Sequence, residues 1–173
     1  VSAFLLTRSS DLAMQLPGDI LGALTDPDVT KTAFNASFER VCLSAWLLGA
    51  GNGYLDPEQW DCTMVAAARC GLPLSLAQCG EVLGLDERDE GKMKESKALI
   101  RKFSVPNRKG ERTLPGDDPE AWEVFKAYCR RDVEVEQAVR RRVTRIGQPE
   151  WESGLYHVDQ RINDRGVLID RRL

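Results

Sequence analysis

The sequence predicts a helix-rich α/β fold with an incomplete mixed sheet. Two short runs, Val1–Thr7 and Val29–Phe34, have the composition of strands, and several longer segments repeat apolar residues at helical spacing. No apolar run approaches the roughly 20 residues that a bilayer span needs. The 173 residues, of which 42% are hydrophobic, suffice for one core of ordinary size and are too few for two full domains.

Four short helices are expected in the first half of the chain, each bounded by residues that start or stop helices. Pro17 opens the first, because its fixed φ suits a first helical turn, and Asn35 begins the second. Trp60–Thr63 leads into the third, and Ser75 can cap the fourth. A turn at Thr25–Asp28 separates the first helix from the second strand. The four helices are expected over Pro17–Leu24, from near Asn35 to the glycines at 49–53, over Met64–Cys70 and over Leu76–Leu83.

The second half is expected to contain a basic helix, a loop, the longest helix and a final helix. Asp118-Pro-Glu starts the longest helix, and Gly147 ends it. Its apolar face consists of Trp122, Phe125, Cys129, Val139, Val143 and Ile146. In chain order the four elements are expected over Glu90–Phe103, Ser104–Asp118, Asp118 to about Ile146, and Trp151–Asn163.

Charge is distributed unevenly along the chain. Residues 1–90 carry 5 basic and 13 acidic residues, whereas residues 91–173 carry 19 and 14, so the halves have net charges of −8 and +5. The overall net charge of −3 argues against a general nucleic-acid binder. The basic half suggests a local anionic partner, and the alternative is two ordinary solvated faces.

The five cysteines and the single histidine, His157, restrict the metal and redox chemistry. No two cysteines have C-x-x-C spacing, so a zinc site and a disulfide framework are both unexpected. Cys42 and Cys129 fall on apolar helical faces, which predicts small core residues. Any metal ion here would be a hard cation, such as Mg²⁺ or Mn²⁺, held by carboxylates.

Three acidic residues, and an asparagine near one of them, invite either a chemical or a structural interpretation. Asp132 lies on or beside the buried stripe of the long helix, one turn after Tyr128, and could hold a metal or pair with a neighbouring arginine. Asn35 could cap a helix and Glu39 could face the positive end of its dipole. Asp61 is most simply another cap.

Three motifs follow one another in a definite order. They are Asn-x-x-Phe-acid at the end of a strand (residues 35–39), Asp-x-Thr-Met (61–64), and Tyr-x-x-x-Asp late in a long helix (128–132). Together they resemble the proofreading 3′–5′ exonuclease region of family A, DNA polymerase I-type, DNA polymerases in the form carried by phages and prophages. The similar stretches, in order from about residue 29 to the end of the chain, are Ala33–Arg40, Trp60–Met64, Gly71–Leu76, Lys97–Ile100, Phe103–Pro106, Tyr128–Val133 and Asp159–Asp170.

The resemblance implies a ribonuclease H-like fold of the tyrosine-type branch, with four metal-binding acids and two Mg²⁺ or Mn²⁺ ions. Glu39 and Asp132 match two of those acids, and Tyr128 matches the tyrosine that orients the attacking water. A phenol with an intrinsic pKa of roughly 10 would stay neutral in that role. Asn35 and Phe38 match residues beside the 3′ end of the substrate.

The resemblance also implies the partners of the chain: a single-stranded 3′ end of DNA, the polymerase domain of the same chain, and no membrane. Three basic segments could contact the phosphate backbone: Lys92–Lys102, which includes Lys97 and Arg101, Arg108–Arg112 and Arg140–Arg145. For the arginines at 140–142 the alternative is a favourable charge near a helix C-terminus. The exonuclease-like domain is expected over residues 1–146 and the start of the polymerase region over 147–173. The implied location is the cytoplasm of a bacterial host.

Two departures from the family pattern change what is expected of this chain. Glu39 stands where the family usually has Asp, and its extra methylene moves the carboxylate by roughly a bond length. No Asp-x-Glu motif precedes Asn35, so the first strand and its acids are expected to be lost from the N-terminus. The chain as given is therefore expected to bind Mg²⁺ weakly and to show little or no nuclease activity. The alternative function is a non-catalytic scaffold that binds DNA and supports the polymerase domain.

Overall fold

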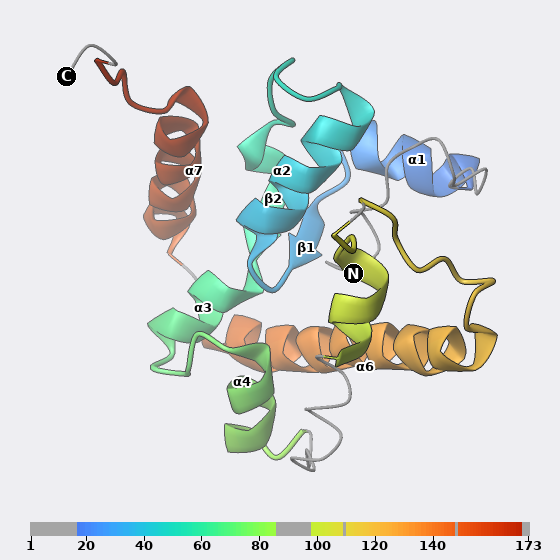
Figure 1. Cartoon of the computed structure of the whole chain (residues 1–173). Helices are drawn as coiled ribbons and strands as arrows, with labels where there is room; N and C mark the ends of the chain where they lie inside the picture. The colour runs from blue at the N-terminus through green and yellow to red at the C-terminus, as the bar shows by residue number, and fades with distance from the viewer. Residues whose placement is uncertain (1–16, 86–97, 109, 148, 171–173) are drawn as a thin grey trace.

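A parallel pair of short strands forms the sheet of the described residues, and helices surround it (Figure 1). The computed structural model describes residues 17–85, 98–108, 110–147 and 149–170. Strand β1 (Lys31–Ala33) pairs with β2 (Trp60–Cys62), with Lys31 opposite Trp60 and Ala33 opposite Cys62. Parallel strands need a crossover, and helix α2 (Ala36–Leu47) supplies it. The prediction of a helix-rich α/β fold is thus confirmed, although the described sheet is parallel rather than mixed.

The strands differ from those expected in two respects. The run Val29–Phe34 does contain a strand, but only its middle residues pair. Strand β2 was not predicted, because a three-residue segment is too short to display an alternating pattern. The expected strand at Val1–Thr7 lies outside the described residues.

Within residues 17–85 the structure has four α-helices, close to the expected positions. They are α1 (Gly18–Thr25), α2, α3 (Thr63–Arg69) and α4 (Leu76–Val82), and a short 3₁₀ helix, η1 (Pro57–Gln59), precedes β2. The expected turn after α1 forms, with the Asp28 amide donating to Asp26 Oδ1 at 2.9 Å. Asn35 and Ser75 occupy the residues before α2 and α4, but neither side chain makes a capping hydrogen bond. The prediction that these two side chains cap their helices was therefore wrong.

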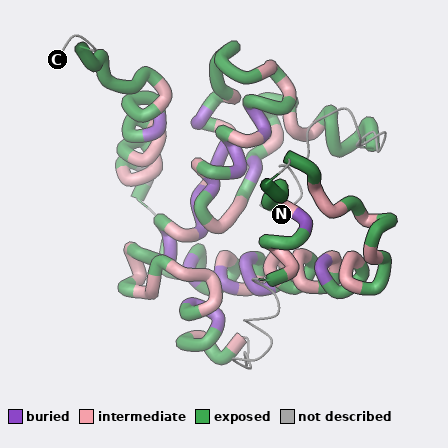
Figure 2. Tube along the Cα trace, in the orientation of Figure 1, coloured by how far each residue is buried: buried purple, intermediate pink, exposed green. Residues whose placement is uncertain are grey.

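The long helix is α6 (Pro119–Val143), continued by the 3₁₀ turn η2 (Thr144–Ile146). It lies beneath the sheet and α2 in Figure 1 and packs against α3 and α4. The core there consists of Ala66, Ala67, Cys79, Val135, Val139 and Val143. Figure 2 shows buried stretches along α6, α3 and α4. Val135 was missing from the predicted apolar face, whereas Ile146 was included wrongly, since it is 69% exposed. A periodic pattern identifies the apolar face of a helix. It does not show how much of the helix length the neighbouring helices cover.

A second apolar cluster joins the sheet to α2 and to the last helix, α7 (Glu150–Arg165). Its buried members are Ala36, Leu43, Trp60 and Cys62. Tyr156 of α7 packs against them, and burial raises the pKa of its phenol above the usual range. This helix therefore contributes to the same core as β1 and β2.

The basic helix expected over Glu90–Phe103 is described only for residues 98–104, which are helical. Phe103 docks this segment on the start of α6, with its ring centroid 5.1 Å from Trp122 and 5.5 Å from Phe125. None of the described helices is long and apolar enough to cross a membrane.

All five cysteines are free thiols. Cys62 and Cys79 are buried, whereas Cys42 and Cys129, which the sequence predicted as core residues, are only half-buried. Their helical faces were identified correctly, but each lies near the edge of the buried stripe. Partial burial still raises the pKa of both thiols.

Candidate functional site

A pocket of about 510 Å³ opens between the sheet, α2, the helix at 98–104 and α6. Four of the residues singled out from the sequence lie on its walls. Phe38 and Glu39 come from α2, and Tyr128 and Asp132 come from α6. Segments that are far apart in the chain therefore meet at one concave surface.

The turn between β1 and α2 places Glu39 in this pocket. Asn35 adopts a left-handed backbone conformation (φ 70°, ψ 52°), which asparagine tolerates better than most residues. The chain reverses there, so Phe38 and Glu39 lie in the first turn of α2. Glu39 is only 4% exposed and sits near the positive end of the helix dipole, while Phe38 is exposed at the rim. Asn35 itself is not part of the pocket wall.

One face of α6 supplies the opposite wall. Tyr128, Asp132 and Glu136 follow one another at intervals of four residues, so they lie along the same side of the helix. Glu136 is buried, and its Oε1 accepts a hydrogen bond of 2.5 Å from the Thr63 hydroxyl of α3. Glu136 was not predicted as a site residue, although its four-residue spacing from Asp132 was visible in the sequence.

Lys31 is a second pocket residue that sequence reasoning missed. Its ammonium group donates to the Asp26 carbonyl oxygen at 3.0 Å and to Gln59 Oε1 at 2.8 Å. Loss of hydration lowers its pKa, partly offset by the carboxylates of Asp26 and Asp56. A cation at the start of β1 thus stands at the same pocket as the carboxylates of Glu39 and Asp132.

Arg101, one of the predicted phosphate-binding residues, does not line this pocket. Arg101 lines a separate hollow of about 500 Å³ together with Lys102 and Arg112. Lys97 lies outside the described residues. The second hollow is more basic than the first, and Lys102 in its wall forms an ion pair with Asp118.

The arginines at the end of α6 contact other parts of the chain. Arg140 pairs with Asp61 at 2.8 Å, and Arg142 donates to the Leu83 carbonyl oxygen. Asp61 lies within β2 and is therefore not a helix cap, contrary to the simplest interpretation of the sequence. Two of the three arginines at 140–142 thus connect α6 to its neighbours.

Three carboxylates of the described residues line the pocket, those of Glu39, Asp132 and Glu136. Mg²⁺ and Mn²⁺ prefer oxygen ligands, and Glu39 and Asp132 bring two carboxylates to one pocket. Glu136 lines the same pocket, but it is engaged with Thr63. Within residues 17–85, 98–108, 110–147 and 149–170, no group of three or more His, Cys, Asp or Glu is arranged to hold a metal ion. Glu39 and Asp132 therefore supply two oxygen donors to this pocket and do not make a complete ligand set by themselves.

Comparison with known proteins points to the phage DNA polymerases. The chain is similar to a protein named DNA polymerase from Bacillus phage SP02, with 47% identity over 161 residues. The match covers 90% of this chain and 24% of the relative, so the chain spans about a quarter of the length of the curated relative that it matches. No family profile matches the chain, and no solved structure matches it significantly. The similarity supports the phage-polymerase part of the resemblance inferred from the motifs.

Proposed function

We propose that this chain is the 3′–5′ exonuclease-like part of a phage-type family A DNA polymerase, and that its pocket receives the 3′ end of a DNA strand. The observation that carries the proposal is the meeting of Phe38, Glu39, Tyr128 and Asp132, from two distant motifs, at one pocket. The similarity to a phage DNA polymerase supports DNA as the substrate. The family's ribonuclease H-like fold is part of this proposal.

Each pocket residue has a role in the proposed hydrolysis of the terminal phosphodiester. Glu39 and Asp132 would hold Mg²⁺ or Mn²⁺, which when bound supplies Lewis-acid chemistry and a more acidic water. The Tyr128 hydroxyl would orient the attacking water, and the exposed ring of Phe38 would contact the terminal nucleotide. The water oxygen adds to phosphorus, the bond to the preceding 3′ oxygen breaks, and a nucleoside 5′-monophosphate leaves.

A second candidate function is a DNA-binding scaffold of the same fold without catalysis. It is favoured by the ligand count, because the described residues contain no group of three metal-binding side chains. In this case the basic second half would still bind single-stranded DNA through its phosphates.

Digestion of a 5′-labelled single-stranded oligonucleotide in Mg²⁺ or Mn²⁺ separates the two functions. We would compare this chain, the natural-length product of its gene, and two variants of that product, Asp132→Ala and Glu134→Ala. Glu134 is the matched control, because it is an exposed acid on the same helix that does not line the pocket. We expect little or no digestion by this chain alone.

A 3′-shortening ladder from the natural-length product that Asp132→Ala abolishes and Glu134→Ala preserves is the result expected of an exonuclease. The scaffold function is supported if none of the proteins produces a ladder while all bind the oligonucleotide with a salt-dependent affinity. Rapid digestion by this chain alone would contradict the expectation that Glu39 and Asp132 by themselves are insufficient for nuclease activity.

A further inference from the structure

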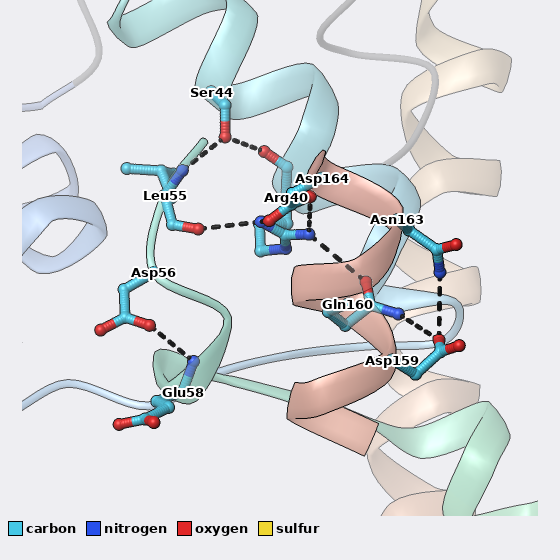
Figure 3. A network of polar contacts seen from close by, with 9 residues as sticks. All are labelled: Arg40, Ser44, Leu55, Asp56, Glu58, Asp159, Gln160, Asn163 and Asp164. Atoms are coloured by element: carbon cyan, nitrogen blue, oxygen red, sulfur yellow. Dashed lines mark hydrogen bonds and ion pairs between the residues drawn. The ribbon is translucent and has the colours of Figure 1, made fainter. Parts of the chain in front are cut away.

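Arg40 is a fully buried charge placed directly beside the pocket residue Glu39. Its side chain is 1% exposed, so its guanidinium group must find partners inside the protein. Nη1 donates to Asp164 Oδ2 at 2.9 Å and Nη2 donates to Asp164 Oδ1 at 2.6 Å, which makes the pair bidentate (Figure 3). Nη1 also donates to the Leu55 carbonyl oxygen at 2.9 Å. The carboxylate that neutralises Arg40 therefore comes from α7, far along the chain.

A second set of hydrogen bonds lies one helical turn further along α2. One turn after Arg40, the buried Ser44 hydroxyl donates to the Arg40 carbonyl oxygen at 2.7 Å and accepts from the Leu55 amide at 2.8 Å (Figure 3). Gln160, one turn before Asp164 on α7, accepts a longer bond of 3.4 Å from Arg40 Nη2. The turn of α2 that carries Arg40 thus contacts α7 and Leu55, and the turn that carries Ser44 contacts Leu55.

Glu39 is on the pocket side of the same helical turn. Neighbouring residues of an α-helix point about 100° apart, so Arg40 can face α7 while Glu39 faces the pocket. Arg40 contacts α7, and Glu39 and Leu43 line the pocket wall. A shift of α2 at Arg40 would therefore carry the Glu39 carboxylate with it.

We propose that Asp164 of α7 is a positioning residue for Glu39, acting through the buried Arg40. This inference rests on the proposed function, in which Glu39 holds a divalent cation. It assigns a role to a helix that lies beyond the exonuclease-like region expected from the sequence. Undocking of α7 would leave the Arg40 charge buried without its carboxylate and would loosen the turn that carries Glu39.

The direct test is the position of the Glu39 carboxylate, measured without any metal. Its ¹³C NMR signal is assigned by its loss in Glu39→Gln and then followed in Asp164→Asn, which keeps the shape of the side chain but removes its charge. Arg161→Gln is the matched control, because it breaks the exposed ion pair between α7 and Glu58 of η1 without touching Arg40. We expect the Glu39 signal to move in Asp164→Asn and to stay in place in Arg161→Gln.

Mn²⁺ affinity then measures the functional consequence in the folded protein. We expect Asp164→Asn to weaken Mn²⁺ binding by about tenfold, as outer-shell changes at metal sites commonly do, and Arg161→Gln to leave it unchanged. If Asp164→Asn does not fold, Asp164→Glu replaces it, since it keeps the charge on a longer side chain. We expect Asp164→Glu to shift the Glu39 carboxylate signal by a smaller amount than Asp164→Asn would, in the same direction. An unmoved Glu39 signal in folded Asp164→Asn would overturn the proposal. Absence of Mn²⁺ binding by the unaltered chain would instead count against the proposed metal role.

Discussion

The Thr63 hydroxyl and the Glu136 carboxylate form a buried hydrogen bond between α3 and α6. Thr63→Val keeps the volume and branching of the side chain but removes the donor. Because the buried carboxylate then loses this bond, we expect a loss of about 1–3 kcal/mol in the free energy of unfolding, measured in urea. Thr144→Val is the control, since its exposed hydroxyl donates to the Arg140 carbonyl oxygen one turn earlier in the chain. Equal losses in both variants would contradict a special role for the buried pair.

Single residues also show where sequence reasoning reached its limit. Glu39, Tyr128 and Asp132 were identified from motif spacing, and all three line one pocket, while their catalytic roles stay predictions. Glu136 and Lys31 line the same pocket, yet nothing local distinguishes a buried charged residue from an exposed one of the same type. Their environment arises from side chains that are distant in sequence, such as Thr63.

Helix termini are the features of the elements that were hardest to predict. The start of α6 was identified correctly, because Asp118 Oδ1 does accept from the Ala121 amide at 3.1 Å and proline follows at the first helical residue. Asn35 and Ser75 have residue types that favour caps, but neither side chain bonds to its helix. In Asn35 the left-handed backbone replaces the extended conformation that a capping residue usually adopts. Residue type alone therefore does not specify a cap.

The Asp118 cap of α6 makes a prediction about pH. Hydrogen bonds from the Lys102 ammonium and from the Ala121 amide hold the pKa of the Asp118 carboxyl below its usual value. A carboxyl group whose pKa is lower in the folded protein stabilises it above the unfolded-state pKa, and this contribution is lost as the pH falls through the folded-state pKa. Asp118→Ala should therefore lower the melting temperature by a few degrees at pH 7 and progressively less below about pH 4.

Glu120→Ala is the control for this helix terminus. Glu120 is exposed in the first turn of α6 and tests the helix dipole without a capping bond. Thermal unfolding followed by circular dichroism from pH 7 to pH 3 measures all three proteins. A loss in Asp118→Ala that stays constant across this range would show that the cap acts without its charge.

At the scale of the whole molecule, the order of the motifs was more informative than any element. It predicted that distant segments share one site, and α2 and α6 do meet at the pocket. It did not predict that α7 packs on α2 and η1, because the contact depends on a buried arginine whose partners come from elsewhere in the chain. The domain boundary at residue 146 stays a prediction.

The distribution of basic residues predicts how the chain would bind single-stranded DNA. Arg101 is exposed in the wall of the second hollow, and Arg108 is exposed next in sequence to Asn107 of that wall. Arg140 is instead half-buried and paired with Asp61. Each phosphate contact contributes roughly 0.7 to the slope of log affinity against log salt for a single strand. Arg101→Gln and Arg108→Gln should each weaken binding and reduce that slope by about this amount, when affinity is measured by fluorescence anisotropy between 50 and 200 mM salt.

Arg140→Gln should leave the slope unchanged and lower the free energy of unfolding instead, because it breaks a contact between α6 and β2. A slope reduced only by Arg140→Gln would place the DNA-binding surface at the end of α6.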